Sequence, residues 1–457
     1  MGIECRRRDM RRLRNRIAAR CGRASARRRH RGFDVAGLLG NHPEQRRDRD
    51  NATGASPRRP GATSLAIRGV PASPAHDRVI EDAVFGSSLS IEGLTIDSGY
   101  FSSSADPVIG GCIKSFGDVS LKDVVVSNCL LKAVPPSEVG AVPPVMAQGG
   151  CLSVQGQLSV VNSTISGCEA NAGGDGIRAT GGGIYAGVLY MAYSTLSQGK
   201  ATAIGANAIG GGIRTGRLMM VASNVLDCHA QVGGGIFEYG GPVVIAGSTI
   251  ARNVSSYEAG GAALLPYGGT TSIINSTIAG NTTAGYVAGV LIGSHYGITE
   301  VQNSTIAGNN SSLSWPTIGA GLTTQSQRNF LLNSSIVAGN FALGEPSDVG
   351  VANAQSASPN GSGNLIQYIS PTLSPPDLYF SACPELGPLR NNGGPTLTLA
   401  LLSGSPAVYG GSNPTTLAYD QRGAGYARET IGFTDIGAYQ SQPENVFSTG
   451  FDGCASP

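Results

Sequence analysis

Two glutamates are the residues of this sequence whose type and spacing come nearest to a hydrolytic site. Hydrolysis of a glycosidic bond uses two carboxylates about 5–5.5 Å or about 6.5–9.5 Å apart. Glu238 and Glu258 fall in successive units of a sequence repeat and are the best candidate pair. The competing interpretation is two solvated loop acids. Acids are scarce between Gly149 and Ala342 and do not cluster: they are Glu169, Asp175, Asp227, Glu238, Glu258 and Glu300.

Basic residues and histidines add little catalytic or metal-binding chemistry. A polysaccharide lyase would place Arg or Lys beside Ca²⁺-binding acids. His229 and His295 lie far apart without the spacing of metal ligands, so we interpret them as two surface histidines. Asp420 and Arg422 are interpreted as a buried ion pair that fixes a turn. We therefore predict no metal site and no cofactor. The basic residues of the repeat are Arg178, Lys200, Arg214, Arg217, Arg252 and Arg328.

The candidate residues of the central region lie in a sequence repeat, which determines where they stand in the fold. Each repeat unit contains a small-residue run, a short apolar stretch and a variant of Asn-Ser-Thr-Ile-Ala-Gly-Asn. The units recur at steps of 31, 29, 25, 28, 28 and 30 residues. Such a period indicates a solenoid or another repeat array, in which each unit buries its apolar face against its neighbours. The glycines disfavour helices, and ~28 residues are too few for a propeller blade of ~40–45. The residues after the Ser-Thr step are Ile165, Leu196, Val225, Ile250, Ile278, Ile306 and Ile336.

The sequence therefore predicts an all-β fold, a right-handed parallel β-helix of nine or ten coils over residues 60–345. The seven residues just named are expected to form one inward stack. A compact β-rich domain is expected to cap the solenoid at its C-terminal end.

The turn after the second strand of each unit ends in Asn four times in succession, at Asn253, Asn281, Asn309 and Asn340. Amides stacked about 4.8 Å apart can hydrogen-bond along the stack. The alternative is that Asn is present because it tolerates a left-handed turn. We predict the ladder.

Four cysteines recur at equal spacing. Cys112 and Cys151 both follow Gly, Cys129 and Cys168 both close a turn, and each pair is 39 residues apart. Each pair is therefore expected at one place in adjacent coils, within the Cα separation of a disulfide. Two interpretations stay open: disulfides Cys112–Cys151 and Cys129–Cys168, or buried stacks of free thiols. Disulfides would fit an oxidising, extracellular destination.

Residues 1–59 differ from the rest of the chain. Of 32 basic and 30 acidic residues, 18 basic and 6 acidic ones lie in residues 1–60. The repeats are therefore mildly acidic, which argues against a nucleic-acid partner. Residues 1–59 lack the apolar stretch of a secretory signal, and we interpret them as a wrongly chosen start or an out-of-frame translation in place of a signal peptide and cap. The alternative is a disordered basic arm that could bind nucleic acid. Because the segment is rich in Arg and has no apolar face, we expect it to be disordered and to make no packed contact with the solenoid.

Two resemblances to known families follow from the motifs. The Gly-Gly-Ile openings and Asn-Ser-Thr-Ile-x-Gly-Asn closings over about residues 88–342 resemble the β-helix repeats of bacterial pectin-lyase-like and polymorphic outer-membrane proteins. Four motifs near the C-terminus are together similar to the choice-of-anchor Q domain. They are Asn391-Asn392-Gly393-Gly394-Pro395-Thr396, Ala400 to Ala407, Asp420-Gln421-Arg422-Gly423 and Asp435-Ile436-Gly437-Ala438-Tyr439. That domain ends β-helix proteins exported to bacterial surfaces. The sequence departs from it at Val408-Tyr409-Gly410-Gly411, where the family usually has Ile-Asp-Ala-Gly.

These resemblances imply a loop-rich connection over residues 346–390, the anchor-like domain over 391–441 and a tail over 442–457. Val446 to Asp452 resembles a terminal segment of exported proteobacterial proteins. No stretch approaches 18 consecutive apolar residues, so no transmembrane helix is predicted.

Two functional classes remain open. The favoured one is a non-enzymatic exported protein, extracellular or on the bacterial cell surface, that acts as an adhesin-like or glycan-binding scaffold and is a monomer. Its partners are expected to be glycans or other cell-surface molecules. The alternative is a polysaccharide lyase or glycoside hydrolase, since the fold alone does not exclude it.

Overall fold

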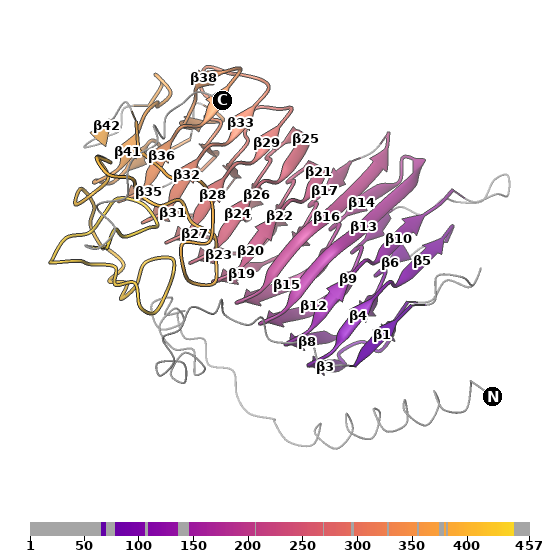
Figure 1. Ribbon diagram of the computed structural model, residues 1–457. Coiled ribbons are helices and arrows are strands. Elements are labelled where there is room, and N and C mark those ends of the chain that lie inside the picture. The colour runs from indigo at the N-terminus through magenta and orange to yellow at the C-terminus, as the bar shows by residue number, and fades with distance from the viewer. Residues whose placement is uncertain are drawn as a thin grey trace, which may run out of the picture. The chain divides into compact units, whose positions relative to one another are not determined.

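The computed structural model describes residues 65–69, 78–105, 108–135, 146–205, 207–267, 269–293, 297–326, 329–353, 356–373, 379–380 and 383–442. Within these ranges the protein is all-β, has no helix, and forms a parallel β-solenoid of about nine turns (Figure 1). The interpretation of residues 1–59 and the resemblance of the 446–452 segment lie outside the described residues.

Two sheets run along the solenoid axis, and each strand pairs with its equivalents in the coils before and after it. The first column of sheet A contains β1 (Ala66–Arg68), β4 (Thr95–Asp97), β9 (Val125–Ser127), β13 (Thr164–Asp175), β16 (Thr195–Ile204), β20 (Asn224–Leu226), β24 (Thr249–Ala251), β28 (Thr277–Ala279), β32 (Thr305–Ala307), β36 (Ile336–Ala338), β41 (Leu365–Ile366) and β42 (Tyr379–Phe380).

The other strands of sheet A continue each coil after a turn. They are β5 (Tyr100–Ser103), β6 (Val108–Ile109), β10 (Leu130–Ala133), β11 (Met146–Gln148), β14 (Arg178–Thr180), β17 (Ala208–Ile209), β21 (His229–Val232), β25 (Val254–Glu258), β29 (Thr282–Thr283), β33 (Asn310–Ser311), β37 (Phe341–Ala342) and β38 (Glu345–Pro346). The long strands β13 and β16 span both columns.

Sheet B closes each coil with one or two strands. It contains β2 (Ile80–Asp82), β3 (Ser88–Glu92), β7 (Ile113–Ser115), β8 (Asp118–Lys122), β12 (Leu152–Val161), β15 (Ile184–Ala192), β18 (Ile213–Thr215), β19 (Leu218–Val221), β22 (Ile236–Tyr239), β23 (Val243–Ala246), β26 (Ala262–Leu265), β27 (Thr271–Ile274), β30 (Val290–Ile292), β31 (Thr299–Gln302), β34 (Leu322–Thr324), β35 (Phe330–Asn333), β39 (Val349–Val351) and β40 (Pro359–Asn360). Parallel pairing thus continues past residue 345, the predicted end of the solenoid, through β39, β40 and β41.

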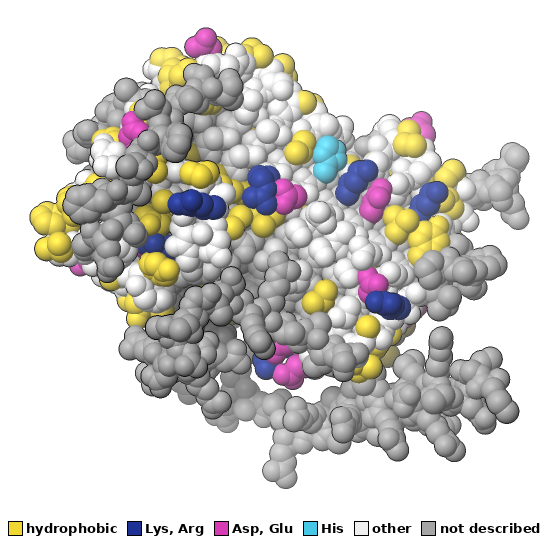
Figure 2. All heavy atoms as spheres, viewed as in Figure 1, with side chains coloured by type: hydrophobic (Ala, Val, Ile, Leu, Met, Phe, Trp, Pro, Cys, Tyr) yellow, Lys and Arg dark blue, Asp and Glu magenta, His cyan; other side chains and the backbone are white. Residues whose placement is uncertain are grey.

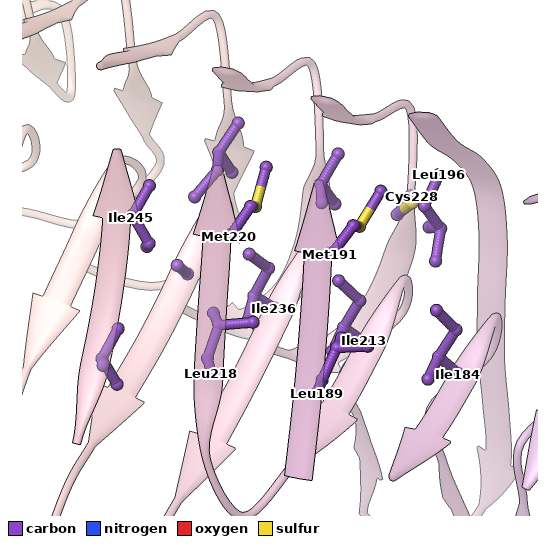
Figure 3. Packing of buried hydrophobic residues seen from close by; sticks show 14 of the residues in the cluster. Ile184, Leu189, Met191, Leu196, Ile213, Leu218, Met220, Cys228, Ile236 and Ile245 are labelled. Atoms are coloured by element: carbon purple, nitrogen blue, oxygen red, sulfur yellow. The ribbon is translucent and has the colours of Figure 1, made fainter. Parts of the chain in front are cut away.

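Aliphatic side chains from both sheets fill the interior in stacks, because matching residues of successive coils lie about 4.8 Å apart. Figure 3 shows part of this core, in which Ile184, Leu189 and Met191 of β15 lie beside Ile213, Leu218 and Met220 of the next coil. Each of these side chains is buried.

Six of the seven residues predicted to form one inward stack are in register: Ile165, Leu196, Val225, Ile250, Ile278 and Ile306. The seventh, Ile336, is wrong by one position. Ile306 pairs with Val337, and Ile336 pairs with Thr305 on the outer face of the strand. Ile336 is nevertheless buried, because the C-terminal segment covers it with Ala407 and Ile436.

The predicted asparagine ladder is confirmed. The Nδ2 of Asn253 donates to Asn281 at 3.0 Å, that of Asn281 to Asn309 at 2.9 Å, and that of Asn309 to Asn340 at 2.8 Å. Asn340 donates at 2.8 Å to the buried carboxylate of Asp348, which ends the ladder. The residue with the left-handed backbone conformation is the one before each asparagine, for example Gly280 with φ 64°. The alternative interpretation, that the asparagines are present because they tolerate a left-handed turn, is therefore wrong.

A second ladder, of serines, is not predicted from the sequence. A serine immediately precedes the first sheet A strand of successive coils. Its hydroxyl accepts a hydrogen bond from the backbone N–H of the serine one coil earlier, as from Ser248 to Ser276 at 3.1 Å. Each hydroxyl donates to the carbonyl two residues before it, as from Ser276 to Ile274 at 2.7 Å. The members are Ser163, Ser194, Ser223, Ser248, Ser276, Ser304 and Ser335, and the ladder ends at Asn364.

The disulfides form, but the predicted pairing between coils is wrong. The bonds are Cys112–Cys129 and Cys151–Cys168, each within one coil, with Cα atoms 5.6 and 5.3 Å apart. The predicted partners do stack in register, since Leu152 pairs with Ile113 and Glu169 with Leu130. Stacked side chains point the same way, however, whereas Cys112 and Cys129 face each other across the interior of one coil.

The ladder asparagines and the second cysteine of each disulfide occupy equivalent positions in their coils. The position opposite each ladder asparagine is glycine, at Gly235, Gly261, Gly289 and Gly321, and an added Cβ there would meet the amide of the asparagine. Two adjacent coils nearer the N-terminus instead carry a cysteine on both sides. Two coils after the Cys151–Cys168 coil, Cys228 faces Gly212 and is a free, buried thiol.

This pattern predicts that Gly212→Cys closes a third disulfide with Cys228. A Cβ on Gly212 would lie 3.0 Å from the Cys228 sulfur, which is about the distance that an S–S bond of ~2.05 Å imposes. It would also lie 2.7 Å from the Gly235 carbonyl oxygen, so the backbone must shift slightly. Under oxidising conditions we expect non-reduced tryptic fragments 201–214 and 218–252 to be linked. Gly235→Cys is the control, since Asn253 faces it; an alkylatable Cys228 in the Gly212→Cys variant would contradict the prediction.

The C-terminal segment, residues 383–442, lies along the solenoid rather than over its end. It contains isolated β-bridges, such as Arg390 with Thr398, in place of the predicted compact β-rich cap. Figure 1 shows it in yellow beside β27, β31 and β35. Gln421 fastens it: its Nε2 donates to Thr249 at 2.9 Å, and its Oε1 accepts from Thr277 at 2.5 Å. A row of outward Thr and Asn side chains on β20 to β32 thereby becomes an internal interface.

Candidate functional site

The structure does not bring Glu238 and Glu258 together. Glu238 lies on β22 in sheet B, between Thr215 and Leu264 of the adjacent coils, and its side chain is fully buried. Glu258 ends β25 in sheet A and pairs with Val232. The buried carboxylate of Glu238 belongs to sheet B, and the carboxylate of Glu258 belongs to sheet A. The two glutamates therefore form no catalytic pair.

The interpretation of Glu238 as a solvated loop acid is also wrong. Its Oε1 accepts a hydrogen bond from the Gly241 N–H at 2.9 Å, and Oε2 has no partner among the described residues. Burial raises the pKa of Glu238 to about 7, although backbone donors and Arg214 oppose the shift. Burial also raises the pKa of Glu258, whose Oε1 accepts from the Val287 N–H at 3.0 Å.

A polar groove of about 330 Å³ is the strongest candidate for a binding site. It arises from unequal coil lengths. Lys200 pairs with His229 and Ile209 pairs with Val232, so eight residues of one coil, 201–208, lie opposite only two of the next. The longer path must project outward as a ledge. The groove lies between this ledge and Ser256, with Ala230 and Gln231 among the residues that line it.

Two ionisable side chains stand at the groove. Lys200 and His229 are exposed, occupy neighbouring coils in register, and both line it. Lys200 makes no ion pair within the described part of the chain, and none of the residues that line the groove is acidic. Partial burial lowers the pKa of His229, and the charge of Lys200 lowers it further. At neutral pH the groove therefore carries a fixed cation beside a neutral imidazole. His229 is exposed, as expected of a surface histidine, and lies beside Lys200, whereas His295 lies outside the described residues.

Two buried side-chain oxygens of residues that line the groove have no hydrogen-bond partner among the described residues. They are the Oγ1 of Thr202 and the Oε1 of Gln231. Asn207 and Ser256 add amide and hydroxyl groups to the lining. Figure 2 shows the same face of the molecule, where basic and acidic side chains follow one another in a line that passes a histidine. The groove suits a ligand rich in hydroxyl groups.

The groove is not predicted from the sequence. The signal that could have indicated it is the fall in repeat length from 29 residues between Leu196 and Val225 to 25 between Val225 and Ile250. A long coil followed by a short one leaves a step on the surface of a solenoid.

Asp420 and Arg422 form the predicted buried ion pair, with Nη2 and Oδ2 2.5 Å apart. The guanidinium lies between the rings of Tyr426 and Tyr439, at 3.9 and 3.7 Å from their centroids. Both charged side chains are buried. This arrangement holds the C-terminal segment together and leaves the pair no access to a substrate.

No family model, curated protein or solved structure matches this chain. The resemblances to pectin-lyase-like repeats and to the choice-of-anchor Q domain therefore stay predictions, while the parallel β-solenoid stands on the structure itself. Groups of three or more potential metal ligands are absent from the described residues. The same residues include no helix long and apolar enough to cross a membrane.

Proposed function

We propose that the protein is an exported bacterial β-helix scaffold, secreted or held at the cell surface, that binds carbohydrate in the groove beside Lys200 and His229. The observation that carries the proposal is the pair of buried acceptors in the groove, on Thr202 and Gln231, that the described residues leave without hydrogen-bond partners. A buried polar atom without a partner costs about 1–3 kcal/mol. A small rotation of either side chain would bring its oxygen to the groove surface, where ligand hydroxyl groups would relieve that cost.

Two further features support a glycan ligand. The groove is open and polar, with amide, hydroxyl and ammonium groups that can contact several hydroxyls. Tyr257 follows Ser256 of the groove lining and is 65% exposed. Tyrosine pairs an apolar ring with a polar tip, a combination suited to the face and hydroxyls of a sugar ring. The two disulfides support an oxidising, extracellular location.

Thr202→Val gives a sharp test. The Thr202 hydroxyl oxygen accepts no hydrogen bond from the described residues, so its replacement by an isosteric methyl group should not destabilise the fold. It should weaken binding about tenfold if a ligand donor uses that oxygen, since about 1.4 kcal/mol is a factor of ten. Lys200→Met should weaken binding at least as much. Isothermal titration of the full chain with polysaccharides selected from a glycan array measures both effects.

The matched control is Lys122→Ala. Lys122 is an exposed lysine on β8 in sheet B, paired at 2.8 Å with Glu92. Its loss should leave carbohydrate binding unchanged. Equal affinity of Thr202→Val, Lys200→Met and the parent protein would place the ligand elsewhere. The absence of any carbohydrate ligand on the array would overturn the proposal.

The rival class, a polysaccharide lyase or hydrolase, makes a different prediction. Incubation with a panel of uronic-acid polymers would then release oligosaccharides, and a lyase would give unsaturated products that absorb in the ultraviolet. We expect no product from the purified chain. Product release that is lost in Lys200→Met or Glu258→Gln would replace the scaffold with the enzyme.

A further inference from the structure

The row of outward side chains that contains Lys200 and His229 continues along the solenoid beyond the groove. The strands β25, β29 and β33 carry the row into the next three coils and pair with one another in order (Figure 1). Four steps of about 4.8 Å give the row a length of about 19 Å. Its members, one in each of five successive coils and all exposed, are Lys200, His229, Val254, Thr282 and Asn310.

Three aromatic residues accompany this outward row in its last three coils. Tyr257, Tyr286 and Trp315 follow one another at equal intervals of 29 residues. Tyr257 comes directly after Ser256, which lines the groove. Tyr257 is 65% exposed and Trp315 is 56% exposed, whereas Tyr286 is partly buried. The two exposed rings lie outside the core, so the packing of the solenoid does not require them.

Contacts between coils hold the three aromatic residues in place. A Cβ on Gly285, the residue before Tyr286, would collide with the Tyr257 carbonyl oxygen, so the close approach of these two coils requires glycine. The Leu313 N–H in turn donates to the Gly285 carbonyl at 3.1 Å. The rings of Tyr286 and Trp315 meet edge to face, with centroids 6.3 Å apart and planes at 82°. Tyr286 thus supports the more exposed ring of Trp315 from the side.

Tyr257 and Trp315 provide two exposed rings that are two coils apart. Two coil spacings separate them by about 10 Å along the solenoid axis. That distance is close to one disaccharide repeat of an extended chain of β-1,4-linked pyranoses, in which every second sugar turns the same apolar face to one side. An aromatic ring offers an apolar surface on which such a face can stack. The two rings therefore match alternate sugars of one chain.

The side chains of the outward row beside these rings are uncharged. They are Val254, Thr282 and Asn310, and the last two offer a hydroxyl and an amide to the hydroxyl groups of a sugar. Glu258, directly after Tyr257, is the acidic residue next to the rings in the sequence, and a carboxylate there disfavours an anionic chain. This surface therefore suits a neutral polysaccharide better than a uronic-acid polymer.

We propose that the groove and the rings of Tyr257 and Trp315 form one elongated site, which holds a neutral β-1,4-linked polysaccharide, such as a glucan, xylan or mannan, along the solenoid axis. This inference rests on the carbohydrate-binding function proposed above and names the class of chain that is bound. Each sugar adds about one coil spacing of ~4.8 Å, so the site accommodates about five sugars. A disaccharide fills only part of it and should bind more weakly than a hexasaccharide.

Trp315 is the only tryptophan of the chain, so tryptophan fluorescence reports on the far end of the site. We titrate the full-length protein with cellohexaose, xylohexaose and mannohexaose in a calorimeter. The one that binds should shift the emission to shorter wavelength and reduce quenching by acrylamide. Binding without any change at Trp315 would overturn the elongated site and leave groove binding intact. The same holds if none of the three binds but the array yields another carbohydrate, whereas an array without any ligand contradicts the proposed function itself.

Variants of the rings test the stacking. Trp315→Ala and Tyr257→Ala should each weaken hexasaccharide binding about tenfold, because an apolar ring surface is lost. Tyr239→Ala is the matched control, since Tyr239 is 54% exposed but ends β22 in sheet B, and it should bind like the parent. Parent-like affinity in both ring variants would overturn the stacking. Ring variants that weaken binding while Thr202→Val does not would separate the rings from the groove and overturn the single site.

Discussion

Replacing Asn281 with leucine should lower the free energy of unfolding by about 3 kcal/mol or more. The side chain is fully buried and makes four hydrogen bonds: its Oδ1 accepts from the N–H and Nδ2 of Asn253, and its Nδ2 donates to the Ile250 carbonyl and to Asn309. Leucine has a similar volume but leaves these groups without a partner inside the solenoid, at about 1–3 kcal/mol for each orphaned group. Urea unfolding followed by circular dichroism measures the loss.

Asn310→Ala is the control for this prediction. Asn310 follows a ladder asparagine but is exposed, so the change should stay within about 0.5 kcal/mol. Asn281→Asp adds a second test, because a carboxylate can accept from Asn253 but cannot donate to Ile250 or Asn309. It should destabilise the protein more at pH 8 than at pH 5. If Asn281→Leu unfolds at the same urea concentration as the parent, the ladder does not stabilise the fold.

Glu238→Gln should make the protein more stable above pH 7, by up to about 3 kcal/mol. Burial raises the pKa of Glu238 from 4.5 to about 7. Between these values the folded chain holds a proton that the unfolded chain has lost, so the stability from this group is present below pH 4.5 and is lost as pH rises towards 7. A shift of this size corresponds to about 3 kcal/mol. Glutamine keeps an acceptor for Gly241 and carries no charge.

Urea unfolding at pH 4, 6 and 8 measures this effect. The parent and Glu238→Gln should agree at pH 4 and diverge as the pH rises. Some pH dependence will remain in the variant, because burial also raises the pKa of Asp348 to about 7. Glu300→Gln, on the outer face of β31, serves as the control and should follow the parent. Parallel pH profiles for Glu238→Gln and the parent would show that Glu238 is not the group responsible.

The solenoid and its register could be predicted from the sequence because both depend on local spacing. A fixed phrase at 25–31 residues repeats the same strands and turns, and the Asn ladder follows once matching residues stack. The one error in the inward stack, Ile336, arose because the alignment followed the Ser-Ser step rather than the alternation of the strand. Val337, one residue later, is the inward residue.

Features that depend on the path of a coil in three dimensions could not be predicted in this way. A spacing of 39 residues shows that two cysteines stack, but it does not tell which side chains face each other inside a coil. The direction of the 201–208 ledge, and therefore the groove beside Lys200, has no periodic signal. The position of the C-terminal segment along the solenoid is set by single contacts, such as those of Gln421, that no repeat records.

The asparagine ladder also bears on how this protein can be produced. Asn281 begins an Asn-Thr-Thr acceptor site for N-linked glycosylation, a modification made on Asn-x-Ser/Thr in secreted chains. The nitrogen that would carry the sugar is the Nδ2 that donates to Ile250 and Asn309 within the closed interior. A eukaryotic secretory host that attaches an oligosaccharide there before the coils close would make a chain whose coils cannot stack. Production by bacterial export avoids this block.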